Sequence, residues 1–142
     1  MNIREFDITT DAPGVAALFG QLGYPVSVEA LLARAASSES GSAIVLVAEN
    51  RDGVIGVLAM HVVRPWHEAG RWAIVSALVV DEQVRGSGAG TLLLTAAEAA
   101  ARTEDCSHIE LSSSESRLRA HVFYGRSGFA EVRKRFVKRL LV

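Results

Sequence analysis

The sequence of residues 78–93 predicts an apolar strand, a glycine-rich turn and a helix in direct succession. Arg85 follows the strand, and glycines at positions 86, 88 and 90 precede the helix. Glycine adopts backbone conformations closed to other residues, and the first turn of a helix carries N–H groups that have no intrahelical partner. Arginine adds a permanent charge and a planar fork suited to phosphate oxygens. We therefore expect this segment to bind an anion, with phosphate the best match.

Two familiar phosphate-binding patterns fail on these residues. A mononucleotide P-loop carries Lys and then Ser or Thr after its last glycine, whereas Gly90 is followed by Thr91 and Leu92. The dinucleotide pattern G-x-G-x-x-G breaks at its sixth position, which is Thr91. What fits is Arg-x-x-Gly-x-Gly, formed by Arg85, Gly88 and Gly90. A plain tight turn before a helix is the alternative interpretation of this pattern.

A second motif follows about 30 residues later in the chain. Its members are Ala120, Phe123, Tyr124, Gly128 and Phe129. The two motifs, in this order, resemble those of the GCN5-related N-acetyltransferase (GNAT) family, with a weaker similarity to acetyltransferases of small amines and aminoalkylphosphonates. The second motif of that family usually begins with Asn, where this chain has Arg117. The resemblance covers most of the chain and is best over residues 72–132.

The resemblance implies acetyl-CoA as the acetyl donor. In the family, two parallel strands splay apart and hold the extended pantetheine arm, so the strands ending near Val80 and Ser112 are expected to do so here. The residues expected to contact the donor are Leu78, Val79, Val80, Arg85, Gly86, Ser87, Gly88, Ala89, Gly90, Thr91 and Arg117. A strand N–H near the thioester would stabilise the oxyanion. In the family an Asn at the position of Arg117 contacts the cofactor arm, and the arginine could reach a phosphate instead.

Tyr124 is the expected catalytic residue. Attack of an amine on the thioester expels a thiolate, which a phenol can protonate as it leaves, and the resemblance assigns this role to Tyr124. The alternative is a tyrosine that packs in the core beside Phe123.

The general base is left open by the sequence. Many relatives carry a Glu on the central strand, but residues 73–78 contain no carboxylate. The candidates are His61, His67, Glu68, Glu110 or a water chain. Each of these side chains could also simply face solvent on a strand or loop.

The pattern of strands and helices predicts an α+β domain with the order β-α-α-β-β-β-α-β-α-β-β. Early hairpins and a later strand-helix-strand crossover predict a mixed, mostly antiparallel sheet with one splayed parallel pair. The expected strands are 3–8, 43–49, 54–63, 72–80, 106–112 and a pair within 128–141. The expected helices are about 11–21, 27–36, 88–103 and 117–126.

Length and composition predict one domain over residues 1–142 that is soluble and cytoplasmic. Cys106 is the sole cysteine and the histidines show no metal-ligand spacing, so no metal site is expected. Residues 117–142 carry 8 basic and 1 acidic side chains, although the net charge of the chain is only −1. This cationic region could be a solvated face or attract the phosphates of coenzyme A.

We expect an enzyme that acetylates the primary amine of a small molecule and that does not bind a membrane. Homodimerisation through the terminal strands is a further expectation. Binding of nucleic acid is not expected, because no aromatic residues interleave with the basic ones. The alternatives are a catalytically weak CoA-binding regulatory module and a protein N-terminal or lysine acetyltransferase.

Overall fold

The computed structural model describes residues 1–37, 41–113, 117–132 and 134–141. It divides into two units, Met1–Ser112 and Ser113–Val142, each considered by itself. The expectation of a single domain stays a prediction.

The elements of the first unit are β1 (Asn2–Glu5), α1 (Ala12–Leu22), α2 (Val28–Ala36), β2 (Ala43–Asn50), β3 (Gly53–Val63), β4 (Arg71–Val80), the short 3-10 helix η2 (Glu82–Val84), α3 (Ala89–Thr103) and β5 (Cys106–Leu111). The second unit contains α4 (Leu118–Arg126).

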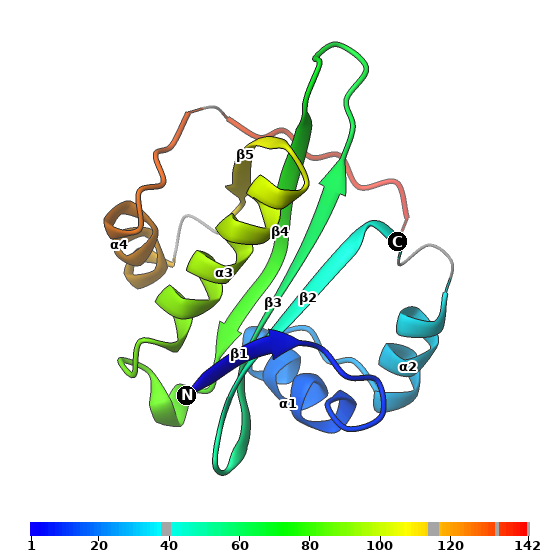
Figure 1. Cartoon of the computed structure of the whole chain (residues 1–142), viewed down its shortest axis with the longest axis vertical. Coiled ribbons are helices and arrows are strands. Elements are labelled where there is room, and N and C mark those ends of the chain that lie inside the picture. Colours follow the sequence, from blue (N-terminus) through cyan, green and yellow to red (C-terminus); the bar gives the residue numbers. More distant parts are fainter. Residues whose placement is uncertain (38–40, 114–116, 133, 142) are drawn as a thin grey trace. The chain divides into compact units, whose positions relative to one another are not determined.

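The first unit is built on a five-stranded sheet in the order β1-β2-β3-β4-β5 (Figure 1). The pairs from β1 to β4 are antiparallel, whereas β4 and β5 are parallel and are joined through α3. This confirms the predicted α+β class and the mostly antiparallel sheet with one parallel pair.

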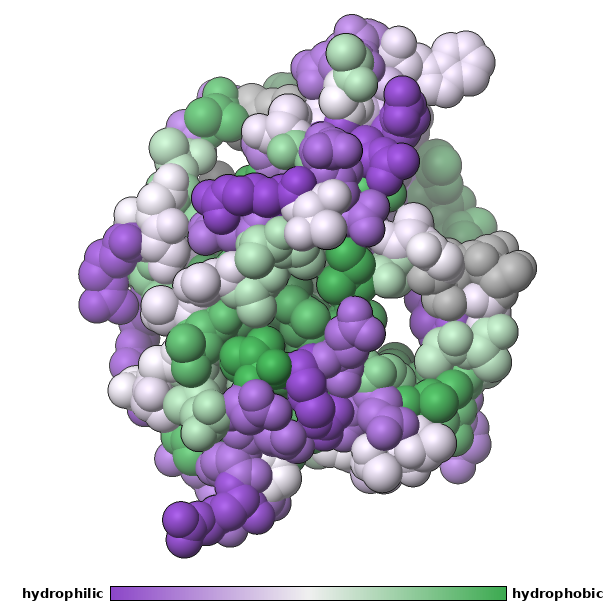
Figure 2. Space-filling view, viewed as in Figure 1, coloured by the Kyte–Doolittle hydropathy of each residue, from purple (hydrophilic) through white to green (hydrophobic). Residues whose placement is uncertain are grey.

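Local sequence chemistry explains several element ends. Asn50 and Gly53 close the β2–β3 hairpin, where Gly53 has φ +121° and the Asp52 N–H donates to Asn50 Oδ1 at 2.8 Å. The tip of this hairpin is hydrophilic in the space-filling view (Figure 2). Ser27 caps α2, because its Oγ accepts the Ala30 N–H at 3.0 Å.

Helices α1 and α3 cover opposite faces of the sheet. Val15 and Leu18 of α1 pack with Val57 of β3, whereas Leu93 of α3 lies against the neighbouring Gly56, where an added Cβ would be 3.1 Å from Leu93 Cδ1. Successive strand residues point to opposite faces, so these contacts define an α1 face and an α3 face. Directly paired residues share a face, which lets the register assign the rest of β4 and β5.

A β-bulge at Ser76 divides β4 into two halves. Ala77 pairs with Ala59, but Val75 pairs with Met60, so Ser76 has no opposite residue in β3. The extra residue shifts the alternation of faces by one position. Before the bulge the even-numbered residues of β4 share the α1 face, and after it the odd-numbered ones do.

The parallel pairing of β4 with β5 ends at the same place. The last pair is Val75 with Leu111, while Ala77 to Val80 pair with β3 alone among the described residues. The second edge of this half of β4 is therefore unpaired in the described part of the sheet. An extended ligand could add to it as a strand does.

Two predictions about strands need correction. The first strand ends at Glu5 instead of residue 8, because Asp7 begins a turn in which its carboxylate accepts the Thr9 N–H at 2.9 Å. The strand pair within 128–141 is wrong: residue 133 lies outside the described residues, and 128–132 and 134–141 form no strand. Alternating apolar residues supply a face but no partner, and Val132, Phe136 and Leu140 are at least 83% exposed.

Candidate functional site

The glycine turn (residues 85–91) connects β4 to α3 through η2. Gly86 and Gly88 have φ angles of 87° and 90°, a left-handed region that disfavours residues with a Cβ. Apart from the adjacent residues of the chain, no described atom lies within 4 Å of the place where a Cβ would stand at either position. Their backbone conformation therefore requires glycine here, and the space above the turn is open.

Side chains of neighbouring segments hold the start of this turn. The Asp81 N–H donates to the Ile55 carbonyl at 2.8 Å, and the Asp81 carboxylate accepts the Gln83 N–H at 3.0 Å. From α1, Gln21 Oε1 accepts the Glu82 N–H at 3.0 Å. These contacts fix η2 against β3 and α1 and so set the direction in which α3 begins.

The helix start leaves backbone N–H groups without a partner inside the helix. The first hydrogen bond into α3 runs from the Leu92 N–H to the Gly88 carbonyl at 3.1 Å, so the N–H groups from Gly88 to Thr91 precede the helical ladder. The Ser87 N–H donates to the Val84 carbonyl at 3.2 Å within the turn itself, and the expected donor contact of Ser87 stays a prediction. Arg85 is exposed beside these groups, and within the described residues its guanidinium makes no ion pair.

The predicted donor residues of β4 lie next to this turn. Leu78, Val79 and Val80 pair with Leu58, Val57 and Gly56 of β3, and their other edge is the one that β5 leaves unpaired in the described structure. Backbone groups of this edge and the N–H groups of the glycine turn form one continuous track. Such a track suits a ligand with amides at one end and phosphates at the other.

Tyr124 lies on α4 in the second unit. Its ring centroid is 5.6 Å from that of Phe123 and 6.0 Å from that of Phe129. The Tyr124 carbonyl accepts the Phe129 N–H at 3.0 Å, and Gly128, with φ 93°, ends the helix. Burial raises the pKa of the Tyr124 phenol and the charge of Arg117 opposes this effect. The phenol is thus protonated at neutral pH and able to donate a proton.

Arg117 precedes the first turn of α4. Its carbonyl accepts the His121 N–H at 3.1 Å, and its side chain makes no capping hydrogen bond. Tyr124 and Arg117 share the second unit, whereas the glycine turn and the four candidate bases belong to the first.

The register brings two candidate bases into one row on the α1 face. His61 of β3 pairs with Ile74 of β4, which in turn pairs with Glu110 of β5. The neighbouring row contains Val63, Trp72 and His108. We call His61, Trp72, Ile74, His108 and Glu110 the β3–β5 patch.

Hydrogen bonds and ring contacts connect this patch to the β3–β4 loop. The Trp72 Nε1–H donates to Glu68 Oε2 at 2.8 Å, and the Trp72 ring centroid is 5.6 Å from that of His67 and 5.2 Å from that of His108. His108 Nε2 lies 2.9 Å from Glu110 Oε2. All four candidate bases are therefore on or beside this patch.

Trp72 and His108 were missed by the sequence interpretation. The signal was available for His108, because residues 108 and 110 lie two apart on a strand and so share a face. For Trp72 the signal was weaker, since its face depends on the bulge at Ser76, which the sequence does not reveal.

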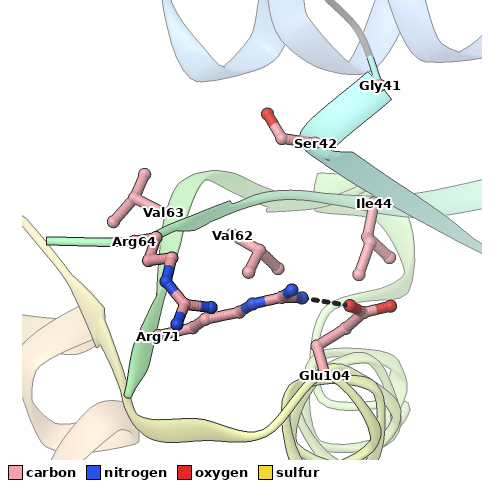
Figure 3. Close-up of a pocket in the computed structure, with 8 residues that line it drawn as sticks. All are labelled: Gly41, Ser42, Ile44, Val62, Val63, Arg64, Arg71 and Glu104. Atoms are coloured by element: carbon pink, nitrogen blue, oxygen red, sulfur yellow. Dashed lines mark hydrogen bonds and ion pairs between the residues drawn. The ribbon is translucent and has the colours of Figure 1, made fainter. Parts of the chain in front are cut away.

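A separate hollow of about 310 Å³ opens on the α3 face (Figure 3). Arg64 and Arg71 extend along it, and Arg71 donates to Glu104 at 3.0 Å (Figure 3). Arg71 begins β4 and Val80 ends it, a separation of about 30 Å along a ten-residue strand. The hollow is thus remote from the glycine turn.

Neither a cluster of metal-ligating side chains nor a helix long and apolar enough to cross a membrane is found among the described residues. No three His, Cys, Asp or Glu side chains among them converge as metal ligands, and the expectation that no metal is required stays a prediction. None of their helices combines the length and apolar character needed to span a bilayer.

Fold and turn together have the architecture of an acyltransferase of the N-acetyltransferase type. The acetyltransferase (GNAT) family matches residues 14–129, well over half of the chain, and the chain therefore belongs to that family. An aminoalkylphosphonate N-acetyltransferase from Salmonella typhimurium is 36% identical over 87 residues, which are 61% of this chain and 56% of that protein.

Solved structures share the fold at lower identity. An acetyltransferase from Trypanosoma brucei has a TM-score of 0.83 and 22% identity, covering 98% of this chain and 99% of the other. Glucosamine-6-phosphate N-acetyltransferase from Arabidopsis thaliana has a TM-score of 0.84 and 21% identity, covering 98% and 97%. At this identity the likeness concerns the fold alone.

Proposed function

We propose that this chain transfers the acetyl group of acetyl-CoA to the primary amine of a small molecule, by direct attack in a ternary complex. The observation that carries the proposal is the continuous track from the unpaired edge of β4 to the open start of α3. The pantetheine amides would bond to the backbone of Leu78, Val79 and Val80, and the pyrophosphate would accept the N–H groups from Gly88 to Thr91. The site would then work inside cells, in the cytoplasm.

Charge complements this binding. Arg85 is exposed at the turn and would hold a phosphate through its guanidinium fork. Arg117, which replaces the family's usual Asn, would reach a second phosphate of the same ligand. Gly86 keeps the left-handed backbone on which both the turn and the direction of α3 depend.

Tyr124 would act as the general acid. The amine nitrogen attacks the thioester carbonyl, the C–S bond breaks, and the phenol gives its proton to the departing thiolate. A raised pKa keeps the phenol protonated over the physiological range. A backbone N–H of β4 near the bulge at Ser76 would stabilise the oxyanion, because the bulge frees this part of the strand from regular pairing.

Two observations support a proposal for the class of acceptor, namely the substrates of similar proteins and the charge of the C-terminal region. The curated relative acts on aminoalkylphosphonates and one structural neighbour on glucosamine 6-phosphate, each of which joins an amine to a phosphorus-containing anion. The cationic C-terminal region, with 8 basic and 1 acidic residues over 117–142, would attract such an anion. Aminoalkylphosphonates and amino-sugar phosphates are therefore the first acceptors to assay.

One observation favours a second function. β4 carries no carboxylate, and a chain that lacked a general base would bind coenzyme A with little turnover. A regulatory module of this kind would bind the donor as tightly as an enzyme does.

Release of free thiol from acetyl-CoA, measured across a panel of amines, separates the two functions. The enzyme hypothesis predicts turnover that falls at least about 100-fold in Tyr124→Phe, with unchanged affinity for CoA. Tyr24→Phe is the matched control, since Tyr24 is 69% exposed after α1. Donor binding without thiol release for any amine would instead support the regulatory module.

A further inference from the structure

We propose that Glu110, oriented by His108, is the general base that takes the proton from the acceptor's ammonium group. The inference rests on the proposed function and assigns the one role that β4 leaves unfilled, since residues 71–80 carry no carboxylate. It also identifies the α1 face of β4 and β5 as the side from which the amine approaches.

Glu110 lies beside the place where the thioester must end. A pantetheine arm can pair with the free edge of β4 only as far as the pair Val75 and Leu111, because β5 occupies the same edge from there on. Glu110 pairs with Ile74, one position before this junction, and both side chains share the α1 face. Adjacent strands are about 5 Å apart, so the Glu110 backbone lies within one strand spacing of β4.

His108 holds the Glu110 carboxylate in place. His108 Nε2 is 2.9 Å from Glu110 Oε2, and His108 Nδ1 is 3.0 Å from Ser107 Oγ. An ionised carboxylate only accepts hydrogen bonds, so Nε2 carries the proton shared between His108 and Glu110. Both ring nitrogens of His108 are thereby engaged, which makes the imidazole a positioning group and leaves proton uptake to the carboxylate.

Exposure permits an acceptor to reach the pair. The side chain of Glu110 is 32% exposed and that of His108 is 38% exposed, while the Trp72 ring lies 5.2 Å from the imidazole and limits its movement. An indole face beside carboxylates also attracts an ammonium group. The patch thus combines a proton acceptor with a surface that favours a cationic amine.

The other titratable groups facing this patch fit the role less well. His61 lies across Ile74 from Glu110, two strand spacings or about 10 Å away. Glu68 accepts the Trp72 Nε1–H at 2.8 Å and lies 3.8 Å from His67 Nε2, and both belong to the loop beyond Trp72, farther from the junction. Glu110 is the carboxylate whose strand position adjoins the end of the β4–β5 pairing.

An ammonium acceptor loses two protons in the reaction, one before and one after the attack on the thioester. One N–H bond breaks and its proton passes to Glu110, which frees the nitrogen lone pair. A C–N bond forms, the C–S bond breaks, and the thiolate takes its proton from Tyr124. The second proton lost by the nitrogen returns to the Tyr124 phenolate, and Glu110 releases the first proton to solvent. The products are the amide, free CoA thiol and one proton.

The test compares Glu110→Gln with wild type on two acceptors. With an alkylamine, which arrives as ammonium, kcat should fall about 100-fold while the affinity for CoA and the melting temperature stay within the range of wild type. With an alkoxyamine, which is uncharged at the assay pH, the loss should be no more than about tenfold because no proton must first be removed. Glu5→Gln, which removes an exposed carboxylate on β1, is the control and should match wild type on both.

His108→Gln tests the positioning role. It should lower kcat for the alkylamine by about tenfold and alter the acidic limb of its pH profile, while His61→Gln leaves that limb unchanged. Equal losses of kcat in Glu110→Gln on both acceptors would overturn the assignment of Glu110, and so would an acidic limb that His108→Gln leaves unaltered. Either result would leave the proposed function standing. A wild-type protein that releases no thiol with any amine would overturn the proposed function and this assignment together.

Discussion

The Leu92 N–H donates to the Gly88 carbonyl at 3.1 Å, and this is the first hydrogen bond of α3. The N–H groups from Gly88 to Thr91 therefore point ahead of the helix, where the positive end of its dipole lies. Because Gly88 needs its left-handed conformation, a substitution there would disturb folding as well as binding. Thr91, at the third helical position, offers a cleaner test.

Thr91→Glu should separate stability from donor binding. A carboxylate in the first turn stabilises a helix by about 0.3–1 kcal/mol, so the melting temperature should hold or rise. The same charge repels a pyrophosphate, and the affinity for CoA should fall by about tenfold or more. Titration calorimetry and thermal melting measure the two effects. The control is Thr95→Glu, which places the charge one turn further along the exposed side of α3 and should leave CoA binding unchanged. Equal affinities for CoA in wild type and both variants would show that the phosphate does not bind at the glycine turn.

Arg85→Ala tests which phosphate the guanidinium contacts. The loss of a charge-assisted hydrogen bond should weaken CoA binding by about tenfold at low salt and by less at high salt. If Arg85 holds the pyrophosphate, the ratio of the dissociation constants of variant and wild type should be the same for dephospho-CoA as for CoA. Arg102→Ala, in the last turn of α3, serves as control. A ratio that disappears with dephospho-CoA would place Arg85 at the 3′-phosphate instead.

The pKa of Tyr124 predicts the alkaline side of the activity profile. Burial raises this pKa above its ordinary value of 10.0, so the phenol stays protonated as pH rises through the neutral range. Turnover should show no Tyr124-dependent decline below about pH 10. A profile of kcat for wild type and Tyr124→Phe checks this, and a decline near neutral pH that the variant lacks would contradict the role of the phenol as acid.

Cys106 should take no covalent part in acetyl transfer. Burial is the largest cause that raises the pKa of its thiol, and the charge of Glu104 adds to it, so little thiolate is present to attack a thioester. Cys106→Ala should retain turnover, and the intact mass of the protein after incubation with acetyl-CoA alone should be unchanged. An added acetyl group that the variant lacks would indicate an acyl-cysteine intermediate.

The first unit contains a half-buried ion pair that should make its stability depend on pH. Asp11 is 3% exposed, and its carboxylate accepts hydrogen bonds from Arg4 at 2.7 and 2.8 Å. Arg4 lowers the pKa of Asp11, so this contribution is present above the unfolded-state pKa and is lost as pH falls through the folded-state value. Asp11→Asn should lower the free energy of unfolding by about 2–4 kcal/mol at neutral pH.

Urea unfolding at neutral pH and at pH about 3 measures this difference. The gap between Asp11→Asn and wild type should narrow at the lower pH, whereas Asp52→Asn in the exposed β2–β3 turn should resemble wild type at both. A gap that stays constant with pH would mean that the carboxylate charge has no part in the effect.

Short-range chemistry explains why much of the fold could be predicted. The cap at Ser27, the turn at Asn50 to Gly53 and the glycine turn each depend on a few adjacent residues whose conformations are restricted. The class of the sheet followed from the order of these elements. Asp11 shows the limit of such reasoning: its position just before α1 suits a helix cap, but its carboxylate makes no capping bond and binds Arg4 instead.

Long-range register explains what could not be predicted. The bulge at Ser76 and the pairing of β4 with β5 decide which side chains share a face, and neither leaves a mark in the local sequence. Four candidate bases could therefore be named, but their grouping around Trp72 and His108 could not. The same limit applies to residues 128–141, where an alternating pattern suggested strands that lack a partner among the described residues.

Thiol release from acetyl-CoA in the presence of aminoalkylphosphonates and other small amines tests the central claim most directly. The proposed function predicts release that depends on both the amine and the protein, with the acetylated amine formed in equal amount and with Tyr124→Phe reduced at least about 100-fold. Absence of amine-dependent release across the panel, in a protein that binds CoA, would contradict it.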